Sequence, residues 1–340
     1  LYTTADVERT LPLIETIPYG RARKLAGGLS VTFHDAGHIL GSSMIEVRAG
    51  DGGDARTLVF SGDIGQWNKP LVRDPSVFQE ADYVVMETTY GDRNHDDPKD
   101  VESLLCDIIA KTVAAGGNVV IPTFAIERAQ ELMFHFSRLS RKKCIPHVLV
   151  FLDSPMAVDV TGVFERHLES LDDETQDLFR SGKKPFEFPG LKLIRTTEES
   201  KAINSIRGSC IIMAGSGMCT GGRIKQHLVR NISRTDSTIL FVGFQARETL
   251  GRQILEGSPA VRILGQMWPV RARVEKILSF SAHADRRGLF RWLDAFERPP
   301  RRLFLTHGEK EIPLALADEL RRDRGWQVSV PEYLEEFELS

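Results

Sequence analysis

The 340-residue chain lacks any apolar run as long as the roughly 18 residues that a membrane-spanning helix needs. It has few cysteines, only Cys106, Cys144, Cys210 and Cys219, and no two of them form a C-x-x-C pair. This spacing excludes a regular disulfide framework and favours reduced thiols in a cytoplasmic protein. We find no internal repeat, no low-complexity tract and no signal-peptide pattern.

A strong excess of charge is also missing, because the formal net charge is only −3 at pH 7. Such a balance excludes a protein that coats nucleic acid indiscriminately. Basic residues still gather in short clusters, at residues 21–24, 138–143, 298–302 and 321–324. Each cluster has two interpretations that the sequence leaves open, a solvated loop or helix end and a surface that follows phosphates.

The pattern of apolar residues predicts alternating strands and helices. Short runs rich in Val, Ile or Phe predict strands at residues 57–61, 82–87, 118–121, 147–151, 209–213, 237–242, 274–279 and 302–306. Helical periodicity fills several gaps, as at residues 126–139 and from Asp285 onward. Strand and helix in repetition predict an α/β fold with a largely parallel sheet in the middle of the chain.

Three residues with metal-ligating side chains follow predicted strands or β-rich runs. His38 comes after Val31 to Phe33, Asp63 after residues 57–61, and His307 after residues 302–306. Side chains at strand ends can meet at one edge of a layered α/β fold, where active sites usually lie. Two histidines and a carboxylate there would form half of a two-metal hydrolytic centre, although each residue alone fits an ordinary loop or turn.

A fourth candidate, His283, lies among small residues that leave space around its ring. A histidine in such a pocket needs an anionic partner to stay protonated and act as an acid. Glu87 ends an apolar strand, where a carboxylate is costly unless it is paired. We therefore expect Glu87 to hold His283, the alternative being an ion pair between Glu87 and Arg93.

A glycine-rich loop at residues 214–222 follows the predicted strand at 209–213 and precedes a helix. Backbone N–H groups in such a loop can cradle a phosphate, although a plain tight turn explains it equally well. The loop lacks the Lys-Ser/Thr ending of a nucleotide-binding P-loop, which excludes that class of NTPase. Residues 122–128 and 244–247 also follow strands and could line the same cleft.

Taken together, these segments resemble the β-CASP branch of the metallo-β-lactamase superfamily. The resemblance covers essentially the whole chain, and within the branch it favours bacterial and archaeal relatives of the mRNA 3′-end-processing endonuclease. It rests on seven segments in order, namely Ala36-Gly37-His38, Ser61-Gly62-Asp63-Ile64-Gly65, Glu87-Thr88-Thr89-Tyr90-Gly91, Ile121-Pro122-Thr123-Phe124-Ala125 with Arg128-Ala129-Gln130-Glu131, residues 213–222, Ser281-Ala282-His283-Ala284-Asp285 and Thr306-His307-Gly308-Glu309.

The resemblance implies a zinc-dependent ribonuclease. Such an enzyme would cleave RNA internally and, as a second mode, from the 5′ end. His38 would bind one zinc ion, His307 a second, and Asp63 would bridge both. A bridging hydroxide would attack the phosphodiester, while His283, held by Glu87, would contact the scissile phosphate and protonate the leaving oxygen. The resemblance implies that the protein binds RNA and does not bind a membrane. It leaves open whether the protein forms a homodimer.

The same resemblance implies which residues position the RNA backbone. They are Ser216 and Gly217 in the glycine-rich loop, together with Arg247. The implied fold is an αββα sandwich that lacks its N-terminal part and carries an inserted α/β domain of mainly parallel sheet. We expect the first part of the sandwich at residues 1–91, the inserted β-CASP domain at 92–281 and the return of the sandwich at 282–340.

One family feature is missing: the H-x-H-x-D-H signature, which would supply four metal ligands ahead of these segments. The six remaining histidines form no replacement cluster: His34, His95, His135, His147, His167 and His227. Because the chain begins at Leu1, we expect it to be a fragment that binds zinc poorly and cleaves little RNA by itself.

Two other functions stay open at this point. The chain could be a non-catalytic RNA-binding or scaffold paralogue of an RNA-processing complex, although a scaffold has no physical need for His38, Asp63, His283 and His307 at strand ends. It could also be a thioester or lactam hydrolase of the same superfamily. The long insertion, which would roof a cleft suited to an extended polymer, argues against that third function.

Overall fold

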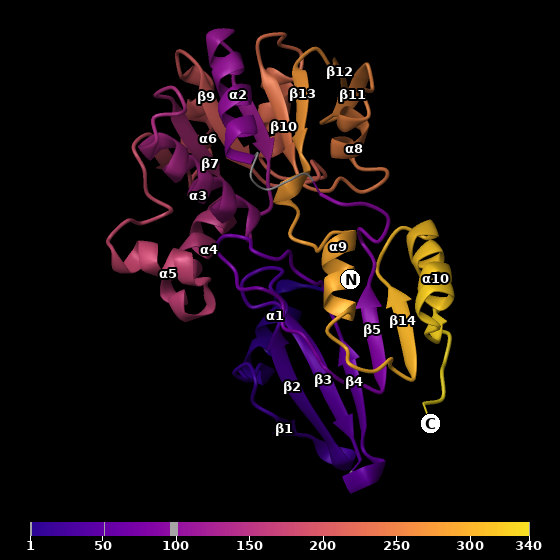
Figure 1. The fold of residues 1–340 in the computed structure, drawn as a ribbon. Coiled ribbons are helices and arrows are strands. Elements are labelled where there is room, and N and C mark those ends of the chain that lie inside the picture. The colour runs from indigo at the N-terminus through magenta and orange to yellow at the C-terminus, as the bar shows by residue number, and fades with distance from the viewer. Residues whose placement is uncertain (1, 51, 96–100, 340) are drawn as a thin grey trace.

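The chain folds around two separate β-sheets (Figure 1) in a computed structural model that describes residues 2–50, 52–95 and 101–339. The first is a seven-stranded sheet in the order β1-β2-β3-β4-β5-β14-β15. Its strands β1 to β4 are antiparallel, and β4, β5, β14 and β15 are parallel to one another. The strands are β1 (Arg23–Lys24), β2 (Leu29–Asp35), β3 (Ser43–Ala49), β4 (Arg56–Phe60), β5 (Tyr83–Glu87), β14 (Arg302–Thr306) and β15 (Val328–Ser329).

The second sheet has six strands in the order β13-β10-β6-β9-β7-β8, and every neighbouring pair is parallel. Its strands come entirely from the chain between β5 and β14. They are β6 (Val119–Pro122), β7 (Leu149–Asp153), β8 (Leu191–Leu193), β9 (Cys210–Ala214), β10 (Thr238–Val242) and β13 (Arg273–Ile277).

Helices cover both faces of the six-stranded sheet. Along β6, Val119 and Ile121 join one apolar cluster, whereas Val120 joins another, because successive side chains in a strand point to opposite faces. The first cluster contains α2 (Val101–Ala114), α3 (Arg128–Arg141) and α4 (Pro155–Arg166); the second contains α7 (Ile224–Asn231) and α8 (Leu250–Leu255). Strands β6, β9 and β10 are consequently buried at every position.

The seven-stranded sheet is covered on one face only. Met44, Val59 and Val84 are fully buried under α9 (Arg286–Leu293) and α10 (Glu311–Arg324). On the opposite face, which we call the open face, the strand registers align eight apolar residues that all stay partly exposed. These are Leu29, Val31, Phe33, Ile45, Val47, Leu58, Phe60 and Val85.

The remaining elements are short and lie outside the two sheets' main layers. They include α1 (Thr4–Thr10), α5 (Asp173–Arg180), α6 (Thr197–Ala202) and the hairpin of β11 (Ala260–Ile263) with β12 (Gln266–Pro269). No helix in the described part of the chain is long and apolar enough to cross a membrane.

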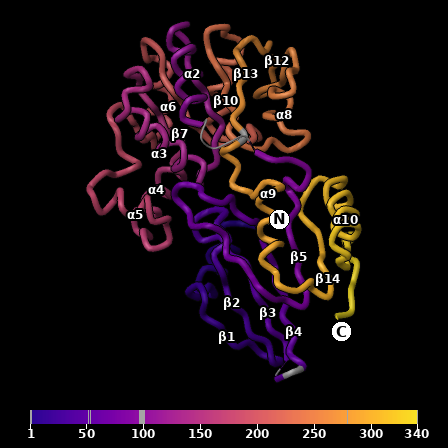
Figure 2. Tube along the Cα trace, in the orientation of Figure 1, coloured from indigo at the N-terminus to yellow at the C-terminus, as the bar shows by residue number. Residues whose placement is uncertain are grey.

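The carboxyl ends of the two sets of parallel strands face each other. Strands β5 and β14 run toward the six-stranded sheet, and β10 and β13 run back toward them (Figures 1 and 2). Contacts join the loops at these ends: the rings of Tyr90 and Phe244 are 5.9 Å apart, and Arg247 pairs with Glu309 at 3.0 Å. The residues that follow these strands are thereby gathered between the two sheets.

The predicted fold class is confirmed, including the mainly parallel sheet in the middle of the chain. The strand predicted at 302–306 has the same bounds in the structure, and the strand predicted at 147–151 lies two residues later, at Leu149–Asp153. Strand β3 was not predicted. It places Glu46 and Arg48 on the opposite side of the strand from Ile45 and Val47, so its pattern alternates and contains no apolar run.

Candidate functional site

The structure brings three of the predicted site residues into one cluster at the carboxyl edge of the seven-stranded sheet. One ligand atom from each of His38, Asp63 and His283 lies within 4.8 Å of the other two. His38 Nε2 lies 3.7 Å from Asp63 Oδ2, and the rings of His38 and His283 are 4.4 Å apart. The three residues follow β2, β4 and β13 respectively, so they meet only through the tertiary fold.

His307 lies next to this cluster. Its Nε2 is 3.4 Å from Asp63 Oδ1, and its ring is stacked at 5.9 Å from that of His283. His307 directly follows β14, and its backbone carbonyl accepts a hydrogen bond of 3.0 Å from the Thr88 N–H after β5. Asp63 therefore lies between two imidazoles, one on each side of its carboxylate.

Glycines let the loops of this cluster approach one another. Gly37 has φ of +63°, and a Cβ there would lie 2.6 Å from the Arg73 carbonyl oxygen. A Cβ on Gly65 would overlap the Gly37 carbonyl oxygen at 1.9 Å, so only glycine fits there. Gly65 also forms a β-bridge with His283. The loops that carry His38, Asp63 and His283 are thus packed backbone against backbone.

The Glu87 carboxylate holds His283 in place. His283 Nδ1 lies 3.0 and 3.2 Å from the two carboxylate oxygens, and the Ile64 N–H donates to the same carboxylate at 2.7 Å. Burial alone would raise the pKa of Glu87, but the hydrogen bond and charge of His283 lower it below its usual range. The alternative partner, Arg93, pairs with Asp92 instead.

The two histidines differ in their electrostatic surroundings. Burial works against the charged form of His283, yet the Glu87 hydrogen bond and charge outweigh it and raise its pKa above the ordinary value. Burial, with the nearby charge of His283, lowers the pKa of His38 to about 3. His38 is therefore a neutral imidazole at pH 7, which is the form that binds a metal ion.

These residues fit a transition-metal ion as a donor set. Imidazole nitrogens and a carboxylate oxygen are the ligands that zinc takes from proteins besides cysteine thiolates. His38 Nε2 lies 3.7 Å from Asp63 Oδ2, so this nitrogen of the ring faces the carboxylate of the cluster. Asp63 is about two-fifths exposed, which leaves its carboxylate open to an ion.

The predicted substrate-binding residues lie across from the cluster, at the carboxyl edge of the six-stranded sheet. Ser216 and Gly217 follow β9, and the Gly221 N–H donates to Ser216 Oγ at 3.1 Å. The Arg247 guanidinium pairs with Glu309, two residues after His307, and is about two-thirds exposed. The structure thus places Arg247 on the same side as His307.

Sequence reasoning missed a second buried carboxylate, Asp153, at the end of β7. Its oxygens accept hydrogen bonds from Arg223 at 2.7 Å, from His227 at 2.6 Å and from Ser200 at 2.6 Å. The signal was present, because Asp153 ends an apolar strand just as Glu87 does. Arg223 directly follows the glycine-rich loop, so this network fixes the end of that loop.

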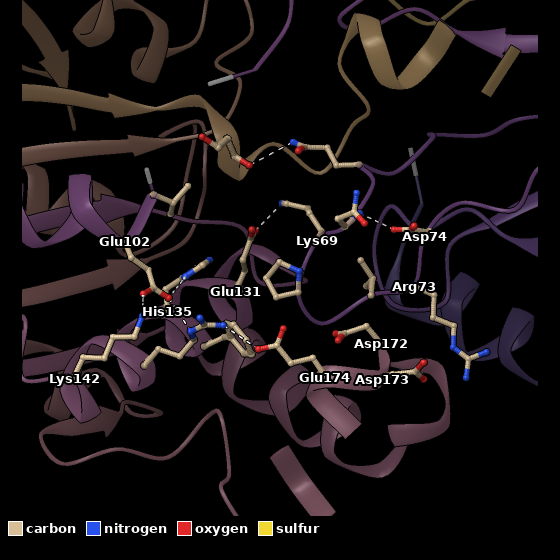
Figure 3. Close-up of a pocket in the computed structure, with 18 residues that line it drawn as sticks. Lys69, Arg73, Asp74, Glu102, Glu131, His135, Lys142, Asp172, Asp173 and Glu174 are labelled. Atoms are coloured by element: carbon tan, nitrogen blue, oxygen red, sulfur yellow. Dashed lines mark hydrogen bonds and ion pairs between the residues drawn. The ribbon is translucent and has the colours of Figure 1, made fainter. Parts of the chain in front are cut away.

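A cavity of about 960 Å³ opens beside the junction of the two sheets (Figure 3). Its inner end holds Lys69, which pairs with Glu131 at 2.9 Å, and its outer rim holds Glu102, which pairs with Arg138 at 2.8 Å and Lys142 at 2.5 Å. Most of the charges there are neutralised by one another. The lining does not include the histidines of the cluster, so the cavity is a separate feature.

The chain is similar to known protein families and to individual characterised proteins. Residues 129–254 match the Beta-Casp domain family, and residues 267–331 match the family described as Zn-dependent metallo-hydrolase RNA specificity domain. The chain is 40% identical to ribonuclease TTHA0252 of Thermus thermophilus over 328 residues, which cover 96% of this chain and 73% of that protein.

Two archaeal relatives are more distant. The chain is 33% identical to transcription termination factor FttA of Methanosarcina mazei over 93% of this chain and 50% of that protein. It is 29% identical to an RNase J-like protein of Methanocaldococcus jannaschii over 93% of this chain and 72% of that protein. The chain therefore spans about half the length of the FttA relative.

Proposed function

We propose a function for this chain, which belongs to the RNA nucleases of the β-CASP branch of the metallo-β-lactamase superfamily. Its histidine and aspartate cluster would supply part of the active site of a zinc-dependent ribonuclease. The observation that carries the proposal is the convergence of His38, Asp63, His283 and His307 from four loops. The substrate is RNA, cleaved internally and, as a second mode, from its 5′ end. The proposed domains are the first part of the metallo-β-lactamase sandwich at residues 1–91, the inserted β-CASP domain at 92–281 and the return of the sandwich at 282–340.

His38, Asp63 and His307 would hold metal, because the Nε2 atoms of the two histidines lie 3.7 and 3.4 Å from the Asp63 carboxylate oxygens. When bound, zinc supplies positive charge that stabilises negative charge developing on the phosphoryl oxygens. Asp63 orients both imidazoles from between them. The chain's own contribution is therefore a fixed, neutral His38 on one side of the carboxylate and an exposed His307 on the other.

His283 acts on the substrate and not on the metal in this proposal. Glu87 fixes Nδ1–H, which leaves Nε2 as the atom that can contact the scissile phosphate and give its proton to the leaving oxygen. Because Glu87 stays ionised, it stabilises the charged imidazole before the transfer and holds the ring in one orientation throughout. Such positioned acid catalysis typically contributes a factor of about 100 or more to the rate.

RNA would enter between the two sheets. Ser216 and the backbone of Gly217 would bind a phosphate, and Arg247 would attract the backbone from the side of His307. By itself the chain offers three protein ligands for two ions. We therefore propose that this polypeptide alone binds zinc weakly and cleaves little RNA.

The test compares the chain alone with a complemented protein, in which the family's H-x-H-x-D-H segment is supplied as a fusion. Cleavage of end-labelled single-stranded RNA is measured with and without zinc. We expect cleavage only in the complemented protein, with loss in Asp63→Asn and no change in His147→Ala, a histidine exposed away from the cluster.

Two results would contradict parts of this proposal. Rapid zinc-dependent cleavage by the chain alone would overturn its inactivity. A complemented protein that binds RNA and zinc but cleaves nothing would favour the alternative function, a non-catalytic RNA-binding scaffold.

A further inference from the structure

An aromatic ring lies uncovered next to the glycine-rich loop. Phe124 comes two residues after the last residue of β6 and is 42% exposed. Val119, Val120 and Ile121 in β6 are at most 1% exposed, so the exposure begins after the strand ends. Isolated exposed apolar residues are common, and the position of this ring, not its exposure alone, gives it meaning.

The ring of Phe124 rests on the backbone of Gly217. A Cβ at Gly217 would lie 2.6 Å from two ring carbons and 2.9 Å from a third, so any larger residue would push the ring away. The loop beneath is fixed, because the buried Gln245 side chain donates to the Gly217 carbonyl at 3.0 Å. One side of the ring is therefore supported, and part of its surface remains available.

A series of contacts leads from this ring to His283. Gln245 follows Phe244, whose ring lies 5.9 Å from that of Tyr90. The ring of Tyr90 in turn lies 6.3 Å from that of His283. Phe124, Gly217 and Gln245 belong to loops at the carboxyl ends of β6, β9 and β10, which are neighbours in the sheet. These are the ends that face the cluster (Figure 1).

We propose that Phe124 is a stacking platform for one unpaired nucleobase of the RNA, held beside the phosphate that the Ser216–Gly217 backbone binds. This inference rests on the proposed function, and it adds a base contact to a site that otherwise offers only backbone contacts. A phosphate and its own base lie within one nucleotide, and the ring and the loop are in van der Waals contact.

The platform determines which form of nucleic acid binds well. Stacking accepts every base because each has a flat π-face, so the site is tolerant of sequence. A base must be unpaired to stack on a protein ring, so single strands are favoured over duplexes. The ring makes no hydrogen bond to an exocyclic group, and Phe124 therefore selects for strandedness without reading sequence.

The experiment measures the dissociation constant of the full 340-residue chain for a single-stranded RNA of about ten nucleotides. The same oligomer with abasic riboses serves as the probe that lacks bases. We expect wild type to bind the normal oligomer about 10-fold more tightly than the abasic one. Phe124→Leu removes this preference, whereas Phe124→Trp, which restores a flat ring, keeps it.

Two further variants separate stacking from other effects. Ile126 lies two residues after Phe124, is similarly exposed and has no aromatic ring. Ile126→Ala should therefore leave the preference for the normal oligomer over the abasic one unchanged. Gly217→Ala leaves residue 124 as phenylalanine but should still reduce the preference, because the new Cβ displaces the Phe124 ring. Circular dichroism checks that each variant is folded.

The outcomes distinguish the two proposals. If wild type binds no RNA, the proposed function fails and the platform fails with it. If wild type binds RNA and Ser216→Ala weakens binding, but Phe124→Leu still prefers the normal oligomer to the abasic one, the stacking inference alone is overturned.

Discussion

The two sheets contain the same local arrangement in different surroundings. In each, a buried carboxylate ends a parallel strand and bonds a histidine from a distant segment: Asp153 with His227 in the six-stranded sheet, and Glu87 with His283 in the seven-stranded sheet. The first pair is sealed, because both side chains are 2% exposed or less. The ring of His283, in contrast, is one-fifth exposed and faces two further histidines.

This difference teaches that the pair itself does not define a catalytic site. Asp153 also accepts from Arg223, just before α7, and from Ser200 in α6, so its carboxylate joins β7 to two helices. Glu87 accepts instead from backbone N–H groups of Ile64 and Thr89 in the loops of the cluster. The first network joins parts of one domain, and the second orients the partly exposed His283 ring beside His38 and His307.

The contrast extends to the sheets that carry the two pairs. The six-stranded sheet has apolar clusters on both faces, as a parallel sheet needs. The seven-stranded sheet has one such cluster, under α9 and α10, and the open face opposite. We therefore expect substitutions on either face of the six-stranded sheet to lower the free energy of unfolding. In the seven-stranded sheet we expect this only for the face under α9 and α10.

The largest expected effect is on the sealed pair. In Asp153→Asn, the buried His227 and the Arg223 guanidinium lose their anionic partner, and we expect the free energy of unfolding to fall by about 3 kcal/mol at pH 7. Denaturant unfolding measures it. Asp159→Asn is the matched control, since that carboxylate is two-thirds exposed. A loss of stability no larger than in this control would contradict the structural role of the pair.

The same variant has a defined pH dependence. Burial alone would raise the pKa of Asp153, but hydrogen bonds from His227, Ser200 and Arg223 lower it below the ordinary value. The stability that this charge contributes is complete above the pKa of an unfolded aspartate, about 3.9. It is lost as the pH falls through the lower folded value. The difference in unfolding free energy between wild type and Asp153→Asn should therefore narrow as the pH falls below about 4.

The second expected effect concerns the exposed pair. In the complemented protein, Glu87→Gln should reduce RNA cleavage about 100-fold, because an amide neither fixes Nδ1–H nor stabilises a charged His283. Single-turnover rates measure this loss. Glu80→Gln, at an exposed carboxylate that pairs with Arg298, is the control. Equal rates in wild type and Glu87→Gln would remove His283 from the chemistry.

The smallest expected effect tests the two faces of the seven-stranded sheet with one substitution. Val59→Thr places a hydroxyl on the fully buried face and should cost about 2 kcal/mol of unfolding free energy. Val47→Thr places it on the open face, where water can reach it, and should change stability by less than about 0.5 kcal/mol. Equal costs would show that the open face is covered in solution.

Much of the local structure could be predicted because it depends on neighbours in the sequence. The strand at 302–306 and the N-cap Asp285, whose side chain accepts from the Gly288 N–H, follow from runs of apolar residues and a capping residue. Strand β3 could not be predicted as easily, because charged and apolar residues alternate along it and leave no apolar run. His227 also gave no signal, since its partner lies 74 positions away.

The sequence by itself determined which side chains stand at strand ends, because strand periodicity and the turn residues after each strand are local properties. These local properties were enough to select His38, Asp63, Glu87, His283 and His307 as candidate site residues. Only the tertiary structure decided that Glu87 and His283, 196 positions apart, share a hydrogen bond, whereas Asp153 and His227 are sealed away. The physical reason is that strand pairing and layer packing bring distant strand ends together, and burial then sets what each pair can do.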